Sequence, residues 1–246
     1  MAESPGLGSG PVLALLDILC VSLPVVAFLS PITIFGPAFC GRDSSIHDGK
    51  EIEMPPLAVT AQMLQCFLFM IYAYDLQMTT LFIPNAIGFL LGFTWSTIYP
   101  FRMSSDNRLQ WQWQYTLAVT CMLLGTVTTY SGNPYISSTI AAFVGVVMCT
   151  YPLPVMRKTL QSRNTALLGS VYMNAAMFSC TAAWVMHSSP WVQFDIFVLV
   201  SNGAGVLVQG AALILRIYLQ RKRSGASVPT QDYEGGQIAM DNTPLL

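Results

Sequence analysis

Long stretches without a charged residue divide this chain into apolar segments of similar length. The uncharged stretches of single-helix length are 18–41, 54–74, 76–101 and 196–215. A longer one, 109–156, contains the turn signal Ser-Gly-Asn-Pro at 131–134, so it predicts two segments. The stretch 164–194 breaks in the same way at Ser-Ser-Pro, 188–190. A helix needs about 20 apolar residues to cross the hydrocarbon layer, so each segment is a candidate transmembrane helix.

These segments predict an all-α membrane protein with seven transmembrane helices. The composition agrees, because 53% of the residues are hydrophobic, only 9% are charged and the mean hydropathy is +0.53. A soluble domain has about 25% charged residues. The predicted spans are 13–37, 56–74, 78–101, 112–131, 135–156, 166–187 and 193–218.

The basic residues predict the orientation of the helices. With seven spans, all eleven Lys and Arg residues fall on one side of the membrane and none on the other. Because basic residues accumulate in cytoplasmic loops, the N-terminus is predicted to be extracellular or luminal and the C-terminus cytoplasmic. The basic residues are therefore interpreted as topology determinants, and the expected surroundings are a lipid bilayer and not a nucleic acid.

Two short patterns occur once in each half of the chain. Ser-Pro-Ile-Thr-Ile-Phe at 30–35 is matched by Tyr-Pro-Leu-Pro-Val-Met at 151–156. Pro-Asn-Ala-Ile-Gly at 84–88 is matched by Ser-Asn-Gly-Ala-Gly at 201–205. Three-helix units joined by one extra helix have the same orientation, so the sequence predicts two parallel repeats in a 3+1+3 arrangement. Such repeats are a known transporter architecture with the substrate near the midplane between them.

The repeats set the predicted organisation of the chain. Its divisions are an outer N-terminal segment 1–12, a first three-helix repeat 13–101, a loop with the linker helix 102–134, a second three-helix repeat 135–219 and a disordered cytoplasmic tail 220–246.

Asn85 and Asn202 occupy equivalent positions in the two repeats. An amide inside hydrocarbon costs free energy unless its donors and acceptors are paired, and it offers both without a charge. The pair therefore suits a neutral, hydroxyl-rich solute better than an ion. The alternative is that both amides only hold neighbouring helices together.

Trp184, in the sixth predicted span, is a second candidate for the binding site. Its indole face could stack on the apolar face of a sugar ring. The alternative is a residue of the aromatic belt at the membrane boundary.

Prolines at or within the spans suggest hinges. Pro31 and Pro152 match across the repeat, and Pro55 and Pro56 open the second span. Proline interrupts the helical hydrogen bonds, so these positions predict either hinges for alternating access or static kinks and helix starts.

No motif indicates catalysis, and we expect no enzyme activity, cofactor or metal ion. The carboxylates nearest the membrane are Asp17, Asp75 and Asp195, all predicted near the outer surface, where they can stay hydrated. Proton-coupled transport usually needs an ionisable group deeper in the bundle, so uncoupled, facilitated transport is favoured.

The ordered motifs between about residues 15 and 219 resemble the SWEET sugar-transporter family. The family's Ser-Pro-x-x-Thr-Phe pattern is similar to 30–35, and its Pro-Asn-x-x-Gly is similar to 84–88. Its Asp followed by Asn and x-x-Gly is similar to Asp195, Asn202 and Gly205. The resemblance implies a 3+1+3 bundle that carries a mono- or disaccharide, most simply a glucose-like sugar, down its gradient.

The resemblance also implies roles for single residues. The implied roles are sugar binding for Asn85, Asn202, Trp184 and Phe69, hinge prolines at Pro31, Pro152 and Pro55 or Pro56, and an outer gate at Tyr72 and Asp195. The second half departs from the family pattern, because His187-Ser188 stands where a tyrosine-glycine pair is expected.

Two other functions stay open. One is a proline-glutamine-loop transporter of amino acids or cystine, although Pro31 and Pro152 are not followed by glutamine. The other is a seven-helix receptor or interaction protein, but the repeat and the short loops argue against this function. A homo-oligomer is compatible with the sugar transporter and with both alternatives.

The tail ends in Asp241-Asn242-Thr243-Pro244-Leu245-Leu246, which resembles an acidic dileucine sorting signal with Asp241, Leu245 and Leu246 as its key residues. The plasma membrane and the endolysosomal membrane are both compatible with it.

Overall fold

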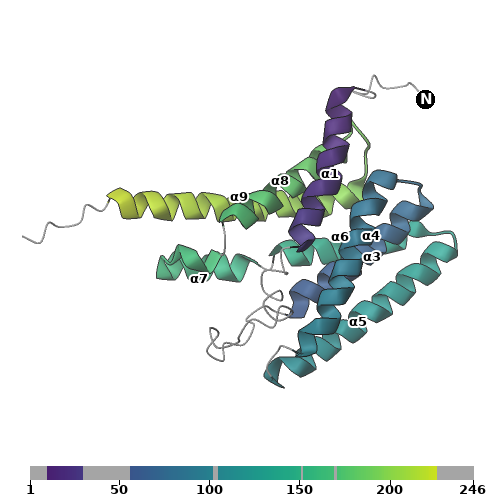
Figure 1. Cartoon of the computed structure of the whole chain (residues 1–246), viewed down its shortest axis with the longest axis horizontal. Helices are drawn as coiled ribbons and strands as arrows, with labels where there is room; N and C mark the ends of the chain where they lie inside the picture. Colours follow the sequence, from purple (N-terminus) through teal and green to yellow (C-terminus); the bar gives the residue numbers. More distant parts are fainter. Residues whose placement is uncertain (1–9, 30–55, 102–104, 151, 169–170, 226–246) are drawn as a thin grey trace, which may run out of the picture.

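The computed structural model describes residues 10–29, 56–101, 105–150, 152–168 and 171–225 (Figure 1). Every regular element within these ranges is helical. The α-helices are α1 (Pro11–Leu29), α3 (Pro56–Asp75), α4 (Thr79–Ile98), α5 (Ser105–Tyr130), α6 (Pro134–Thr150), α7 (Pro152–Ser162), α8 (Val171–His187) and α9 (Ile196–Gly225). Two short 3-10 helices, Tyr99–Phe101 and Thr165–Leu168, complete them.

The helices have the length and composition of membrane spans. Four are long and apolar enough on their own, namely Pro11–Leu29, Thr79–Phe101, Pro134–Ser162 and Ile196–Lys222. The more polar α3, α5 and α8 complete the seven, which confirms the predicted membrane fold. Large apolar side chains such as Phe143 and Leu207 are exposed on the outside, as contact with lipid requires.

The packing of the helices repeats. Helix α1 packs on α4 and α8, and α6 packs on α9 and α3 in the same way. Helix α4 also packs on α3, as α9 packs on α8. Exchanging α1, α3 and α4 with α6, α8 and α9 therefore reproduces the contacts, which confirms the 3+1+3 arrangement. We call α1, α3 and α4 the first bundle and α6, α8 and α9 the second; the linker α5 packs on α3 and α6.

Two glycines of the repeated motif allow close helix contacts. A Cβ atom on Gly88 of α4 would lie 2.6 Å from Sγ of Cys66 on α3. A Cβ atom on Gly205 of α9 would lie 2.5 Å from Cγ2 of Thr181 on α8. Small residues let membrane helices approach closely, so the two glycines have the same packing role in the two bundles.

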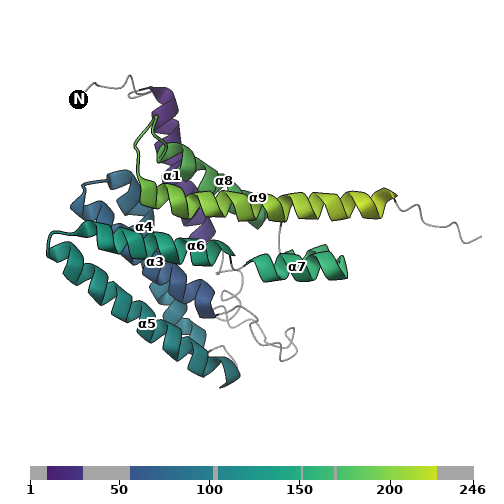
Figure 2. The same cartoon turned by 180° about the vertical axis from the view of Figure 1, so that it is seen from behind.

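The two bundles come together at one end of the molecule and diverge towards the other (Figures 1 and 2). The larger core cluster joins them with side chains from both, including Cys20, Leu81, Trp184 and Val198. Tyr72 belongs to this cluster, and we call this end the Tyr72 end. The start of α1, the α3–α4 turn, the start of α6 and the α8–α9 loop all lie there.

Several helix ends differ from the predicted boundaries. The fifth predicted span, 135–156, is divided into α6 and α7. Pro152 and Pro154 lack the N–H groups needed to continue α6 but are tolerated in the first turn of a new helix. Helix α9 continues to Gly225, beyond the predicted start of the tail at residue 220.

Candidate functional site

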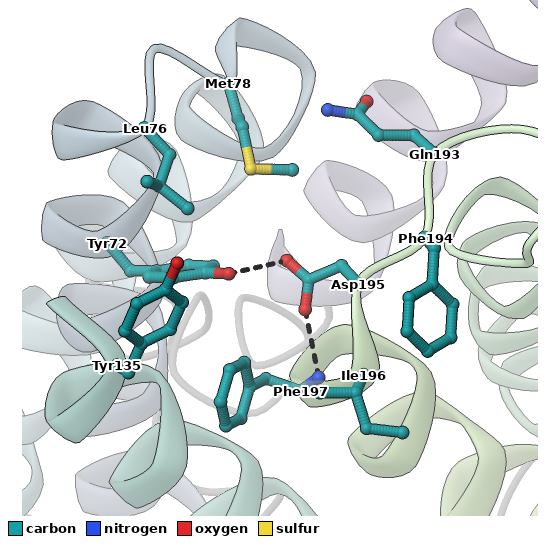
Figure 3. A pocket seen from close by; sticks show the side chains of 9 residues that line it. All are labelled: Tyr72, Leu76, Met78, Tyr135, Gln193, Phe194, Asp195, Ile196 and Phe197. Atoms are coloured by element: carbon teal, nitrogen blue, oxygen red, sulfur yellow. Dashed lines mark hydrogen bonds between the residues drawn. The ribbon is translucent and has the colours of Figure 1, made fainter. Parts of the chain in front are cut away.

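A hydrogen bond joins the two bundles at the Tyr72 end. The hydroxyl of Tyr72 on α3 donates to Oδ2 of Asp195, directly before α9, at 3.0 Å (Figure 3). Oδ1 of Asp195 accepts the backbone N–H groups of Phe197 at 2.9 Å and Val198 at 3.1 Å. Asp195 is therefore the N-terminal cap of α9, a position that aspartate favours. Both members of the predicted outer gate are thus in direct contact, and their role as a gate stays a prediction.

A pocket of about 430 Å³ lies beside this hydrogen bond (Figure 3). Aromatic rings and polar groups share its wall. The lining residues are Tyr72, Leu76, Met78, Tyr135, Gln193, Phe194, Asp195, Ile196 and Phe197. The Tyr72 end is therefore closed between the bundles by the Tyr72–Asp195 contact, with an open cavity next to it.

Asn85 and Asn202 lie at the same depth in the two bundles. Each follows the first residue of its helix, Thr79 or Ile196, by six residues. At 1.5 Å per residue both amides are about 9 Å along their helices from the Tyr72 end. Both side chains are half-buried.

The two amides also have matching hydrogen bonds. Nδ2 of Asn85 donates to the carbonyl oxygen of Leu81 at 2.7 Å, and Nδ2 of Asn202 donates to that of Val198 at 2.9 Å. Among the described residues, Oδ1 of either amide accepts no hydrogen bond. Nδ2 of Asn202 also donates to the hydroxyl of Ser201 at 3.4 Å. Both amides keep an acceptor for a ligand, and Asn85 also keeps a second donor.

The two predicted aromatic residues also occupy equivalent places. Phe69 on α3 and Trp184 on α8 are 3% and 5% exposed and belong to the same core cluster. Burial inside the bundle argues against a belt position for Trp184, whereas Trp113 and Trp191 are largely exposed.

The prolines are only partly described. Pro56 and Pro152 are the first residues of α3 and α7, where proline is tolerated because that N–H has no partner within the helix. Pro31 and Pro55 lie outside the described residues, as do Asp241, Leu245 and Leu246 of the predicted sorting signal. The hinge and sorting roles stay predictions.

One expectation about the carboxylates is wrong. Asp195 is only 6% exposed, because it is enclosed between Tyr72 and the start of α9. Asp75 is exposed, as expected. No group of three or more His, Cys, Asp or Glu side chains in the described part of the chain could hold a metal ion.

A contact between Asp17 and His187 was missed from the sequence. Nε2 of His187 lies 3.0 Å from Oδ1 of Asp17, and the Thr80 hydroxyl donates to the same oxygen at 3.3 Å. The signals were present, because Asp17 interrupts an apolar stretch and His187 replaces a motif tyrosine. Only the packing of α1 against α8 reveals that they meet.

Comparisons with known proteins agree on one family. A family model described as a sugar efflux transporter for intercellular exchange matches residues 14–105. The putative bidirectional sugar transporter SWEET7d of Oryza sativa subsp. japonica is 23% identical over 199 residues, covering 76% of this chain and 68% of the relative. The bidirectional sugar transporter SWEET4 of Oryza sativa subsp. indica is 21% identical over 203 residues, covering 78% and 73%.

A solved structure agrees with the fold. The structure of a eukaryotic SWEET transporter superposes with a TM-score of 0.64 at 19% identity. The superposition covers 84% of this chain and 99% of that one.

Proposed function

Because this chain belongs to the SWEET family of sugar transporters, we propose that it is a facilitative, bidirectional sugar transporter working by alternating access. The substrate class is a mono- or disaccharide, most simply a glucose-like sugar. The observation that carries the proposal is the pair Asn85 and Asn202, at equal depth on equivalent helices with equivalent hydrogen bonds.

The proposed sugar site lies between these two amides. Hydroxyl groups need both donors and acceptors; both amides offer an acceptor, and Asn85 also offers a second donor. Phe69 and Trp184 add aromatic surface from the second helix of each bundle. A site built from two equivalent halves binds a small solute on the pseudo-two-fold axis between them.

In the proposed transport cycle, one bundle rotates against the other. In this structure the bundles meet at the Tyr72 end, where the Tyr72–Asp195 hydrogen bond joins them, and they diverge at the opposite end (Figure 1). Breaking this contact while the opposite ends come together would expose the amides to the other side. The prolines at helix starts and in the fifth span would accommodate the rotation.

We assign the Tyr72 end to the outer or luminal side. The basic residues of the described chain, such as Arg108, Arg157 and Arg221, lie on segments at the opposite end, and basic residues favour the cytoplasm. A tag on the N-terminus should therefore be accessible without permeabilisation, whereas a tag after Leu246 should not. Detection of both tags on intact membranes would contradict this topology.

The proposed transport is uncoupled. Asp17, His187 and Asp195 lie at the Tyr72 end, and the next charged residue along α9 is Arg216. In the described helices, Asp17 contacts Thr80 in the first turn of α4, nearer to the Tyr72 end than the asparagine of that helix, and the other charged residues lie towards the ends of their spans. A proton or sodium pathway usually needs an ionisable group deeper in the bundle, so the sugar should move only down its own gradient.

Uptake by purified protein in proteoliposomes tests the substrate class. A panel of radiolabelled mono- and disaccharides, amino acids and cystine should give counterflow with sugars alone. Counterflow of amino acids or cystine would instead support the proline-glutamine-loop alternative. Failure to move any solute, with the protein folded and inserted, would support a receptor or interaction protein.

A further inference from the structure

A second polar contact joins the two bundles at the Tyr72 end. It links Asp17, one and a half turns into α1, to His187, the last residue of α8, through the 3.0 Å contact between Oδ1 and Nε2. The imidazole is 6% exposed and the carboxylate 40%. The contact is therefore enclosed on the histidine side and reachable by water on the other.

The contact between Asp17 and His187 also involves α4 of the first bundle. Thr80, in the first turn of α4, donates to the same Asp17 oxygen. One carboxylate oxygen thus holds the starts of α1 and α4 in the first bundle and the end of α8 in the second. Tyr72 and Asp195 link α3 of the first bundle to α9 of the second, so the two contacts use different helices for the same connection.

His187 occupies the position in the second repeat that Tyr72 occupies in the first. Each lies three residues after an aromatic residue proposed for sugar binding, Phe69 for Tyr72 and Trp184 for His187. Each also reaches across to a carboxylate associated with the other bundle. The His187 ring lies against Trp184 edge to face, with ring centroids 5.5 Å apart.

We propose that Asp17 and His187 are a second pair of gate residues, which close α8 on α1 at the outer side and position Trp184 while the gate is closed. The inference rests on the proposed alternating-access transport and deepens it. In this account the outer gate has two parts. His187 is the repeat equivalent of Tyr72, whereas Asp17 on α1 is not the equivalent of Asp195 before α9. In the second repeat an imidazole stands where the family pattern has a phenol.

The ionisable group makes the gate sensitive to acidity. An imidazole changes its charge between about pH 5 and 8, and a charged imidazole binds a carboxylate more strongly than a neutral one. The other ionisable groups near the pair are Cys20 on α1, which interacts with Asp17 and with Cys180 on α8, and Asp195 before α9, whose backbone N–H donates to the carbonyl oxygen of Ser188. Acid on the outer side therefore favours the closed gate, and this stabilisation is lost as the pH rises.

Distance measurements between the bundles test the proposal without sugar. Spin labels at Tyr74→Cys on α3 and Trp191→Cys in the α8–α9 loop, both exposed, report the opening of the Tyr72 end in proteoliposomes. The background lacks the six native cysteines. Because no sugar is needed, failure of the gate pair is distinguishable from failure of the proposed sugar transport.

The neutral variants Asp17→Asn and His187→Gln should each lower the closed-to-open ratio by about fivefold, as loss of a partly exposed charged pair implies. The double variant should resemble either single one. Exchange of the two residues, Asp17→His with His187→Asp, should restore part of the closed population. The matched control Asp75→Asn removes an exposed carboxylate at the same end and should leave the distances unchanged.

A pH series on the labelled protein with Asp17 and His187 intact gives an independent measurement. A contact with a purely structural role would not make the closed population depend on pH. The closed population should be larger at pH 5.5 than at pH 8, and His187→Gln should abolish the difference. Additive effects of the two single variants would overturn the proposal. The same conclusion would follow from distances that do not change with pH.

Discussion

The hydroxyl of Tyr72 lies 3.0 Å from Oδ2 of Asp195, across the junction between two three-helix bundles. The Asp195 carboxylate, which accepts the hydrogen bond from Tyr72, also caps α9 by accepting the N–H groups of Phe197 and Val198. The contact that joins the bundles at the Tyr72 end is therefore attached directly to the helix that carries Asn202. Opening the gate and moving half of the proposed sugar site should be one event.

Loss of this hydrogen bond should open the outer side. A hydrogen bond to a charged group contributes about 1.5–3 kcal/mol, so Tyr72→Phe should shift the population towards the outward-open state. Asp195→Asn is the partner variant, because asparagine still caps a helix well. Outer accessibility of a labelled cysteine and sugar flux measure the effect. Strictly additive effects of the two variants would mean that the residues do not act as partners.

A glycine on α9 should be essential for packing, whereas a close neighbour should not be. Alanine at Gly205 places a Cβ atom 2.5 Å from Thr181, and such overpacking costs about 1–3 kcal/mol. Gly203→Ala is the matched control, because a Cβ atom there meets nothing within 4 Å. Thermal unfolding in detergent should show a lower midpoint for Gly205→Ala alone. Equal midpoints for both variants would contradict the packing described for the second bundle.

Sugar should equilibrate across the membrane without an ion gradient. Among the described residues, Asp17 contacts Thr80 in the first turn of α4, and the other charged residues of the spans lie towards the ends of these spans. A protonophore or the removal of sodium should leave the final sugar distribution unchanged. The pair Asp17–His187 should make the rate depend on pH, but not the end point. Accumulation above the outside concentration that collapses with a protonophore would show coupled transport instead.

The sequence predicted the membrane fold well because its signals are local or repeated. Charge-free stretches locate the spans, and the repeated Asn-x-x-Gly motifs place Gly88 and Gly205 on equivalent helices. Contacts across the bundles are not local. Asp17 and His187 are 170 positions apart, so only tertiary packing brings them together. Asp195 was expected to be hydrated because it stands at the end of a span, but the fold covers that end with Tyr72.

Sugar binding to purified, monodisperse Asn85→Ala and Asn202→Ala proteins tests the central claim most directly. Each substitution would leave sugar hydroxyls unpaired in an enclosed site, at a cost of about 1–3 kcal/mol, or roughly 5- to 150-fold in affinity. Trp184→Ala is the companion variant, and it should weaken the binding of sugars with an apolar ring face more than the binding of an acyclic polyol. We predict a large loss of sugar affinity in both asparagine variants, while the folded fraction of each variant stays equal to that of the wild-type protein. Wild-type affinity in both, with lower thermal stability, would show that the amides only hold the helices together and would contradict the central site.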